Sequence, residues 1–188
     1  MRVLSKSRFK LGLECPNKLF YTSNKEYANV KNEDTVLEAL AQGGFQVEEL
    51  ARLHFPGGTL IDEDTWEYEK AWNMTQMLLK LFEGLYIKTD VLVKKGNIID
   101  LIEVKSKSFL PDDEFLFIGK KGGMVAGWKP YLFDVAFQKH VMQSCYPHWK
   151  INSFIMMADK SKTASIDGLN QLFRITKKGN NRTGIISK

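Results

Sequence analysis

Three charged side chains interrupt an apolar, strand-like stretch of the sequence, residues 87–108. Asp90 comes first, turn-forming residues 94–97 (Lys-Lys-Gly-Asn) follow, and Glu103 and Lys105 come after the turn. Because residues two apart in a strand share a face, Glu103 and Lys105 point the same way. An ionised group in an apolar strand is costly unless it is paired, so these residues are the first candidates for chemistry.

The position of the turn decides which residue faces Asp90 across the hairpin. A two-residue turn at 95–96 pairs Asp90 with Leu101, and one at 96–97 pairs it with Glu103. Leu101 and Glu103 are two apart, so both registers put Asp90 on the face of Glu103. We therefore predict that one face of the hairpin presents two carboxylates and an ammonium.

Converging carboxylates repel each other unless a cation neutralises them, and hard oxygen ligands of this kind suit Mg²⁺ or Mn²⁺. A divalent ion can polarise a phosphate, while a lysine beside it can orient water and stabilise charge in the transition state. This set of groups suits phosphodiester hydrolysis. The alternative interpretation is an ordinary acid at a strand end and a Glu-Lys pair on a solvated face, and the three residues alone do not exclude it.

Helices are expected on both sides of the hairpin. Ser5 or Ser7 can cap a short N-terminal helix that Pro16 interrupts. Amphipathic spacing predicts two further helices, at residues 65–82 and 131–145.

Residues 33–55 also repeat apolar side chains with a period near 3.6, and Pro56 follows them. Within this predicted helix, Gly43 and Gly44 mark either a break or a point of close packing. The remaining expected elements are a buried strand at residues 151–158 and an edge strand within residues 172–188.

The composition indicates one globular domain over residues 1–188, because 44% apolar residues can supply one core. The net charge of +5 favours a polyanionic partner without requiring one. We expect no membrane span, since charged residues break every apolar run. Two cysteines are too few for a disulfide framework, which fits a cytoplasmic protein.

The hairpin resembles the RecB-type branch of the PD-(D/E)XK nuclease superfamily, whose motif is an acid, a hairpin and then Glu-x-Lys. Asp90, Glu103 and Lys105 match that motif. The chain is also similar to an uncharacterised bacterial family with a RecB-like nuclease domain that opens LSKSxxxxGLxCP. Three further stretches carry this similarity: LSKSRFKLGLECPNKLFY (4–21), QGGFQVEELARLHFPGG (42–58) and DVAFQKHVM (134–142).

The resemblance implies a restriction-endonuclease-like α/β fold, with a central mixed β-sheet flanked by helices. It also implies that the chain is a RecB-like nuclease domain, and it leaves open that this domain is the N-terminal part of a longer architecture. The implied activity is that of a Mg²⁺-dependent deoxyribonuclease.

The resemblance assigns a metal site to four residues. Asp90 and Glu103 would be ligands, and the Val104 carbonyl an additional one. Glu49 stands where the family has a helix-borne acid that completes the site, while its neighbour Glu48 stands at a position that is usually glycine.

Two more residues receive roles from the resemblance. Lys105 would position the attacking water, and Gln138 matches the glutamine of the RecB-type helix, thought to orient the active-site lysine or to contact DNA. The catalytic set expected from the sequence is therefore Lys105, Glu103, Asp90, Glu49 and Gln138.

The chain departs from the family pattern at two places. Residues 108–129 make the connection to Gln138 longer than usual, so this segment looks like an insertion that either contacts a substrate or partner or is an ordinary mobile loop. Related nucleases join a cysteine equivalent to Cys15 with three others around an iron–sulfur cluster. Here only Cys145 remains, so we do not expect a cluster.

Other residues allow competing interpretations. Cys145 and His148 have C-x-x-H spacing and could join Cys15 and His140 in a zinc site, although this spacing recurs by accident. Trp128 is the best candidate for stacking on a base. Five lysines could follow a phosphate backbone or simply keep the surface soluble: Lys120, Lys121, Lys129, Lys177 and Lys178.

We therefore expect a nuclease that hydrolyses DNA with Mg²⁺ or Mn²⁺ and has nucleic acid, with DNA favoured, as its partner. The sequence does not determine its oligomeric state. One alternative is a non-catalytic nucleic-acid-binding or scaffold module that keeps the nuclease fold. Another is a nuclease that acts on RNA, which the sequence does not separate from one that acts on DNA.

Overall fold

The computed structural model describes residues 4–22, 24, 26–27, 35–58, 85–86, 89–178 and 181–187. Its contacts divide the chain into two compact units. The first comprises Met1–Asp34, Leu79–Glu103 and Asp113–Ile155, and the second comprises Thr35–Leu78, Val104–Asp112 and Met156–Lys188. The expectation of a single domain over residues 1–188 stays a prediction.

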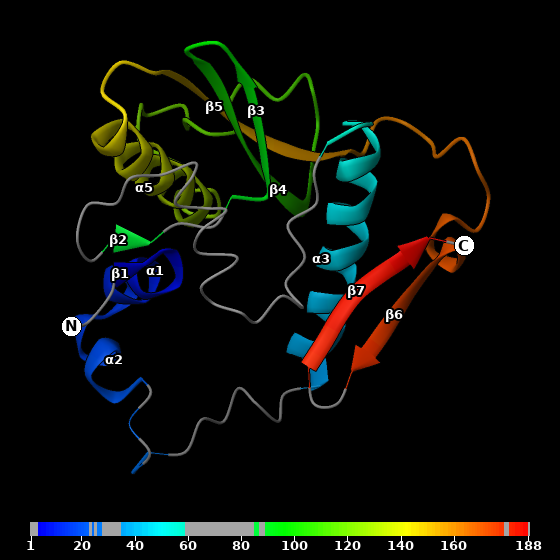
Figure 1. Ribbon diagram of the computed structural model, residues 1–188, viewed down its shortest axis with the longest axis horizontal. Helices are drawn as coiled ribbons and strands as arrows, with labels where there is room; N and C mark the ends of the chain where they lie inside the picture. The colour runs from blue at the N-terminus through cyan, green and yellow to red at the C-terminus, as the bar shows by residue number, and fades with distance from the viewer. Residues whose placement is uncertain are drawn as a thin grey trace. The chain divides into compact units, whose positions relative to one another are not determined.

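A three-stranded mixed sheet has the strand order β3 (Val91–Lys95), β4 (Ile98–Phe109) and β5 (Lys150–Asp159) (Figure 1). Strands β3 and β4 are antiparallel. β4 and β5 run in the same direction, since Lys150 N donates to Asn97 O (2.8 Å) and Lys160 N donates to Phe109 O (3.1 Å). A parallel neighbour requires a crossover, and the connection contains helix α5 (Lys129–Cys145). The predicted α/β class with a mixed sheet and flanking helices is confirmed.

The β3–β4 hairpin turns at Gly96-Asn97, because Lys95 pairs with Ile98. Gly96 has φ of 60°, in the left-handed region that glycine adopts without strain. Of the two registers considered from the sequence, this turn selects the one that places Asp90 across from Glu103, one position beyond the Val91–Ile102 pair.

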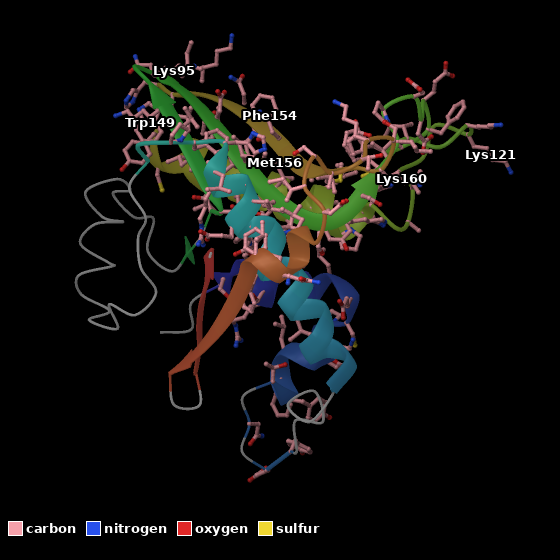
Figure 2. All side chains as sticks on the ribbon, turned by 90° about the vertical axis from the view of Figure 1, so that its right-hand side faces the viewer. Lys95, Lys121, Trp149, Phe154, Met156 and Lys160 are labelled. Carbon is pink, nitrogen blue, oxygen red and sulfur yellow. The ribbon has the colours of Figure 1, made fainter. Side chains whose placement is uncertain are left out.

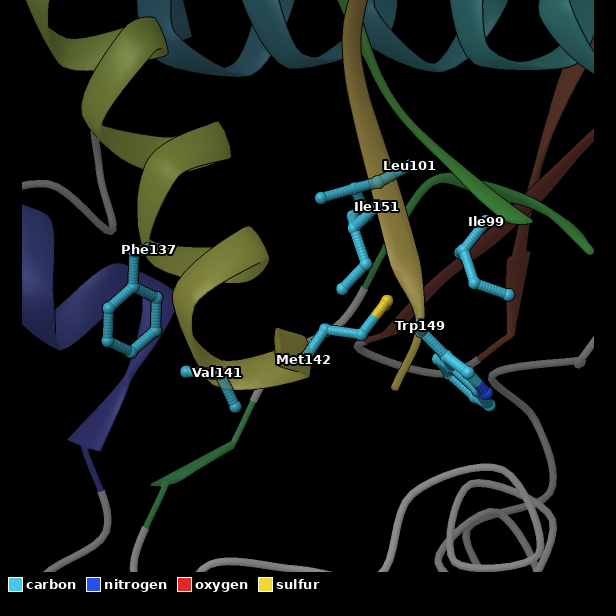
Figure 3. Close-up of a cluster of buried hydrophobic side chains, with 7 residues drawn as sticks. All are labelled: Ile99, Leu101, Phe137, Val141, Met142, Trp149 and Ile151. Atoms are coloured by element: carbon cyan, nitrogen blue, oxygen red, sulfur yellow. The ribbon is translucent and has the colours of Figure 1, made fainter. Parts of the chain in front are cut away.

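The core of the first unit lies between α5 and one face of the sheet (Figure 3). Apolar residues two apart on β4 share the face of the sheet that points into this core. They pack with α5 residues that are spaced three to four apart on one helix face. The fully packed members are Ile99, Leu101, Phe137, Val141, Met142, Trp149 and Ile151.

Helix α1 (Lys6–Glu14) packs on α5 beside this core, with the rings of Phe9 and Phe137 stacked 4.6 Å apart between centroids. Ser5 caps α1 by accepting a hydrogen bond from Arg8 N (3.3 Å). Cys15 is extended, and Pro16 then begins α2 (Pro16–Tyr21). The predicted N-terminal helix, its cap and its interruption are confirmed, and the preceding β1 (Leu4–Ser5) pairs in parallel with β2 (Leu85–Tyr86).

The second unit contains α3 (Thr35–Leu53), the 3₁₀ turn η2 (Leu169–Leu172) and the antiparallel strands β6 (Phe173–Lys178) and β7 (Asn181–Ser187). The predicted C-terminal edge strand is therefore a hairpin. Helix α3 continues through Gly43 and Gly44, and a Cβ added at either would meet no described atom within 4 Å. The prediction of a break there was wrong, and the alternative of a close-packing point gets no support from the described residues.

The connection between β4 and α5 is folded back on itself by hydrogen bonds, although the sequence suggested a mobile loop. Ile118 and Met124 form a β-bridge, and Val125 N donates to Phe117 O (2.9 Å). Trp128 is buried against Phe117 and Tyr131, so the expectation that it is available to stack on a base was wrong. Figure 2 shows Lys121 at the outer end of this loop.

Two other expectations concern helices. The helix predicted at residues 65–82 lies outside the described residues. Within the ranges described above, no helix combines the length and apolar character needed to cross a membrane.

Candidate active site

Glu103 lies on the central strand β4, on the same face as the core residues Ile99 and Leu101. Its exposed fraction is 0%. An ionised carboxylate in such a place is costly unless it is paired and hydrogen-bonded. The sequence pattern is therefore not a charge on a solvated face.

Both oxygens of Glu103 accept hydrogen bonds from residues distant in the sequence. The Lys6 ammonium lies 2.9 Å from Oε1 and 3.2 Å from Oε2. The Gln138 amide nitrogen donates to Oε2 at 2.6 Å. A strand and two helices thus converge on one carboxylate: β4 supplies Glu103, α1 supplies Lys6 and α5 supplies Gln138.

A second buried carboxylate lies beside the first. Asp134 on α5 is 0% exposed, and its Oδ2 lies 3.3 Å from the Lys10 ammonium. Lys6 and Lys10 are four residues apart on α1, as Asp134 and Gln138 are on α5, and this spacing puts each pair on one helix face. We call these four residues together with Glu103 the charge cluster.

The charge cluster raises the pKa of Lys6. Burial is the largest single effect and acts to lower that pKa. The charge and hydrogen bond of Glu103, with the charges of Asp134 and Asp90, together outweigh it. Lys6 is therefore held as a cation among three carboxylates.

Asp90 directly precedes β3, whose first residue, Val91, pairs with Ile102, the neighbour of Glu103. The charge of Asp90 acts on Lys6. That Asp90 and Glu103 together hold a metal stays a prediction. Lys105 follows Glu103 by two residues in β4, so the two side chains leave the strand on one face. Val104 is buried with its side chain on the other face.

Glu49 lies in the second unit, on α3, and does not belong to the charge cluster of the first. Its Oε2 is 2.9 Å from the Arg52 guanidinium, which also lies 4.0 Å from Glu48. The prediction that Glu49 completes a metal site with Asp90 and Glu103 stays a prediction.

A divalent ion would require oxygen ligands gathered in one place. Within the described ranges, no group of three or more His, Cys, Asp and Glu side chains is arranged to hold a metal. Asp90 and Glu103 nevertheless fit a cation, since both charges raise the pKa of Lys6 and the two residues adjoin the Val91–Ile102 pair of the hairpin. Gln138 Oε1 is buried and accepts no hydrogen bond from the described residues, so it remains available to a donor. The carboxylate oxygens of Asp90 and Glu103 and the amide oxygen of Gln138 are hard ligands of the kind that Mg²⁺ prefers.

The cysteine predictions concern Cys15 and Cys145, and both are free thiols. The zinc site considered from the sequence would need them together with His140 and His148. The absence of a metal-holding group among the described residues gives that alternative no support.

Sequence reasoning missed Lys6, Lys10 and Asp134. All three lie inside stretches that carried the family resemblance, and the spacing of four was visible in both. That spacing indicates which residues share a helix face, but not that the two faces meet.

Neither a scan of protein-family models nor a search of curated proteins and solved structures finds a match to this chain.

Proposed function

We propose that this protein is a divalent-metal-dependent nuclease of the RecB-like PD-(D/E)XK type, with a restriction-endonuclease-like fold, that hydrolyses DNA in the cytoplasm. One observation supports the proposal: Glu103 is fully buried, precedes Lys105 on the same face of β4, and follows Ile102, which pairs with the residue after Asp90. Burying a carboxylate near a second one costs free energy unless a cation neutralises their charge.

In this proposal Asp90 and Glu103, with the Val104 carbonyl and Glu49, hold Mg²⁺ or Mn²⁺. The ion, when bound, neutralises phosphate charge and promotes ionisation of water. Lys105 orients the attacking water and stabilises negative charge on the phosphate during in-line displacement. Gln138 positions Glu103 through its 2.6 Å hydrogen bond. By analogy with the superfamily, the product carries a 5′-phosphate.

The second candidate is a non-catalytic nucleic-acid-binding or scaffold module. A specific observation favours it: Lys6 and Gln138 already satisfy both oxygens of Glu103, as they would in a purely structural ion pair. The +5 charge suits either candidate, because both require a polyanionic partner.

Cleavage of single- and double-stranded DNA with Mg²⁺ or Mn²⁺ tests the enzyme. We expect Lys105→Ala and Asp90→Asn each to lower the cleavage rate by about 100-fold or more, since each removes a group that acts on charge in the transition state. Lys107→Ala, two residues further along β4, is the matched control and should cleave at the native rate. Equal rates in all four proteins would exclude the mechanism, and cleavage of RNA alone would reassign the substrate.

A further inference from the structure

Lys6 lies on the carboxylate that the proposed function assigns to a metal. Its ammonium approaches both Glu103 oxygens, at 2.9 and 3.2 Å, and lies within the electrostatic reach of Asp90. No motif considered from the sequence gave this residue a role. Its place on the carboxylate raises the question of what happens to Lys6 when a divalent ion binds.

Lys6 and a divalent ion cannot share Glu103 without cost. A carboxylate offers about four lone-pair positions. In Glu103 three of these are used by the two contacts of Lys6 and the one of Gln138. A metal ion would have to approach to about 2.0–2.6 Å, next to a fixed positive charge. Binding of the ion therefore opposes the Lys6–Glu103 pair.

Helix α1 allows Lys6 to withdraw without unfolding. The Lys6 side chain is 21% exposed, and a lysine can extend its flexible stem to keep its charge in water. Meanwhile the stacked rings of Phe9 and Phe137 and the Lys10–Asp134 pair still attach α1 to α5. The side chain can thus move while the helix stays in place.

We propose that Lys6 is the resident cation of the candidate active site and competes directly with a divalent metal for Glu103. This inference rests on the proposed function and adds its regulation. Without metal, Lys6 neutralises the buried carboxylate and keeps the site folded. With metal, the affinity is reduced by the work of displacing Lys6, so only a sufficiently high concentration of divalent ion loads the site.

Calorimetric titration of the full chain with Mn²⁺ tests the competition. We expect Lys6→Gln, which removes the charge and keeps a hydrogen-bond donor, to bind Mn²⁺ at least about fivefold more tightly than the native chain. Lys10→Gln is the matched control on the same helix face. It should change the affinity by no more than about twofold, because Lys10 contacts Asp134 rather than Glu103.

The outcomes separate this inference from the proposed function. If the native chain binds Mn²⁺, Glu103→Gln abolishes binding and Lys6→Gln binds no more tightly, the metal site stands and the competition is wrong. If neither the native chain nor Lys6→Gln binds Mn²⁺, both the metal site and the competition are wrong.

A second variant covers the case in which Lys6→Gln does not fold. Lys6→Arg keeps the charge and pairs with a carboxylate through two parallel hydrogen bonds, so it should weaken Mn²⁺ binding relative to the native chain. An unchanged or tighter affinity of Lys6→Arg would contradict the competition.

Discussion

Two ion pairs in this molecule have the same length and different surroundings. Lys6 and Glu103 in the first unit are 2.9 Å apart at their nearest atoms, as are Arg52 and Glu49 in the second. The Glu103 side chain is 0% exposed, whereas those of Glu49 and Arg52 are 20% and 40% exposed. By distance alone the two pairs would be equally strong. Because Glu103 is buried, breaking the Lys6–Glu103 pair costs much stability, whereas breaking the more exposed Arg52–Glu49 pair costs little.

The comparison also separates what each pair does. A surface pair such as Arg52–Glu49 can be lost with little effect, because water solvates the remaining charge. Loss of Lys6 would leave the Glu103 charge in the protein interior without the ammonium that neutralises it, although the Gln138 amide would still donate to its Oε2. The buried pair therefore specifies how α1, β4 and α5 meet.

The largest expected effect is on stability when one partner is removed. We expect Lys6→Met to lower the free energy of unfolding by about 3 kcal/mol, since it strands a buried carboxylate. Arg52→Met, the matched surface change, should cost no more than about 1 kcal/mol. Chemical denaturation of both variants measures the difference.

A double variant serves as the control for that prediction. Lys6→Met with Glu103→Gln removes both charges and allows an amide–amide hydrogen bond to Gln138, so it should recover most of the lost stability. A double variant as unstable as Lys6→Met would show that packing of the lysine stem, and not the stranded charge, carries the effect.

A smaller effect is expected from the ring that attaches α1 to α5. Phe9→Ala removes the stack on Phe137 and should lower the free energy of unfolding by roughly 2 kcal/mol. Phe20→Ala on α2 removes a ring that is 66% exposed, and should change the free energy of unfolding by less than about 0.5 kcal/mol. Equal losses in the two variants, again from denaturation curves, would mean that charge alone holds α1.

The smallest effect is expected in the second unit and has the opposite sign. Gly44→Ala should raise the free energy of unfolding by about 0.5–1 kcal/mol, because α3 passes through this position and alanine restricts the unfolded chain. Gly96→Ala in the β3–β4 turn is the control. It should lower stability by about 1 kcal/mol, since Gly96 has φ of 60°. A loss in Gly44→Ala would reveal a close contact on α3.

Local rules predicted the hairpin and its shared face, because alternation along a strand and turn chemistry are set by neighbouring residues. They left two registers open, and the structure has the one that turns at Gly96-Asn97. The Ser5 cap and the start of α2 at Pro16 were predictable for the same reason.

The charge cluster could not be predicted, because it depends on which helix faces meet. On α5 the apolar Ala136 is exposed, while the polar Asp134 and Gln138 are buried. Apolar periodicity does not detect a helix face that buries polar groups for pairing. At Gly43, glycine was interpreted as a signal although the helix tolerates it there.

The ion pairs of the charge cluster also differ from the hairpin in the length of chain that each must close. Lys6 and Glu103 are 97 residues apart, and Lys10 and Asp134 are 124 apart, whereas the β3–β4 turn closes over two residues. Distant contacts carry a larger entropic cost and form late in folding. During synthesis, α1 leaves the ribosome long before its partners exist, so Glu103 acquires its cation only once α1 returns to the finished hairpin.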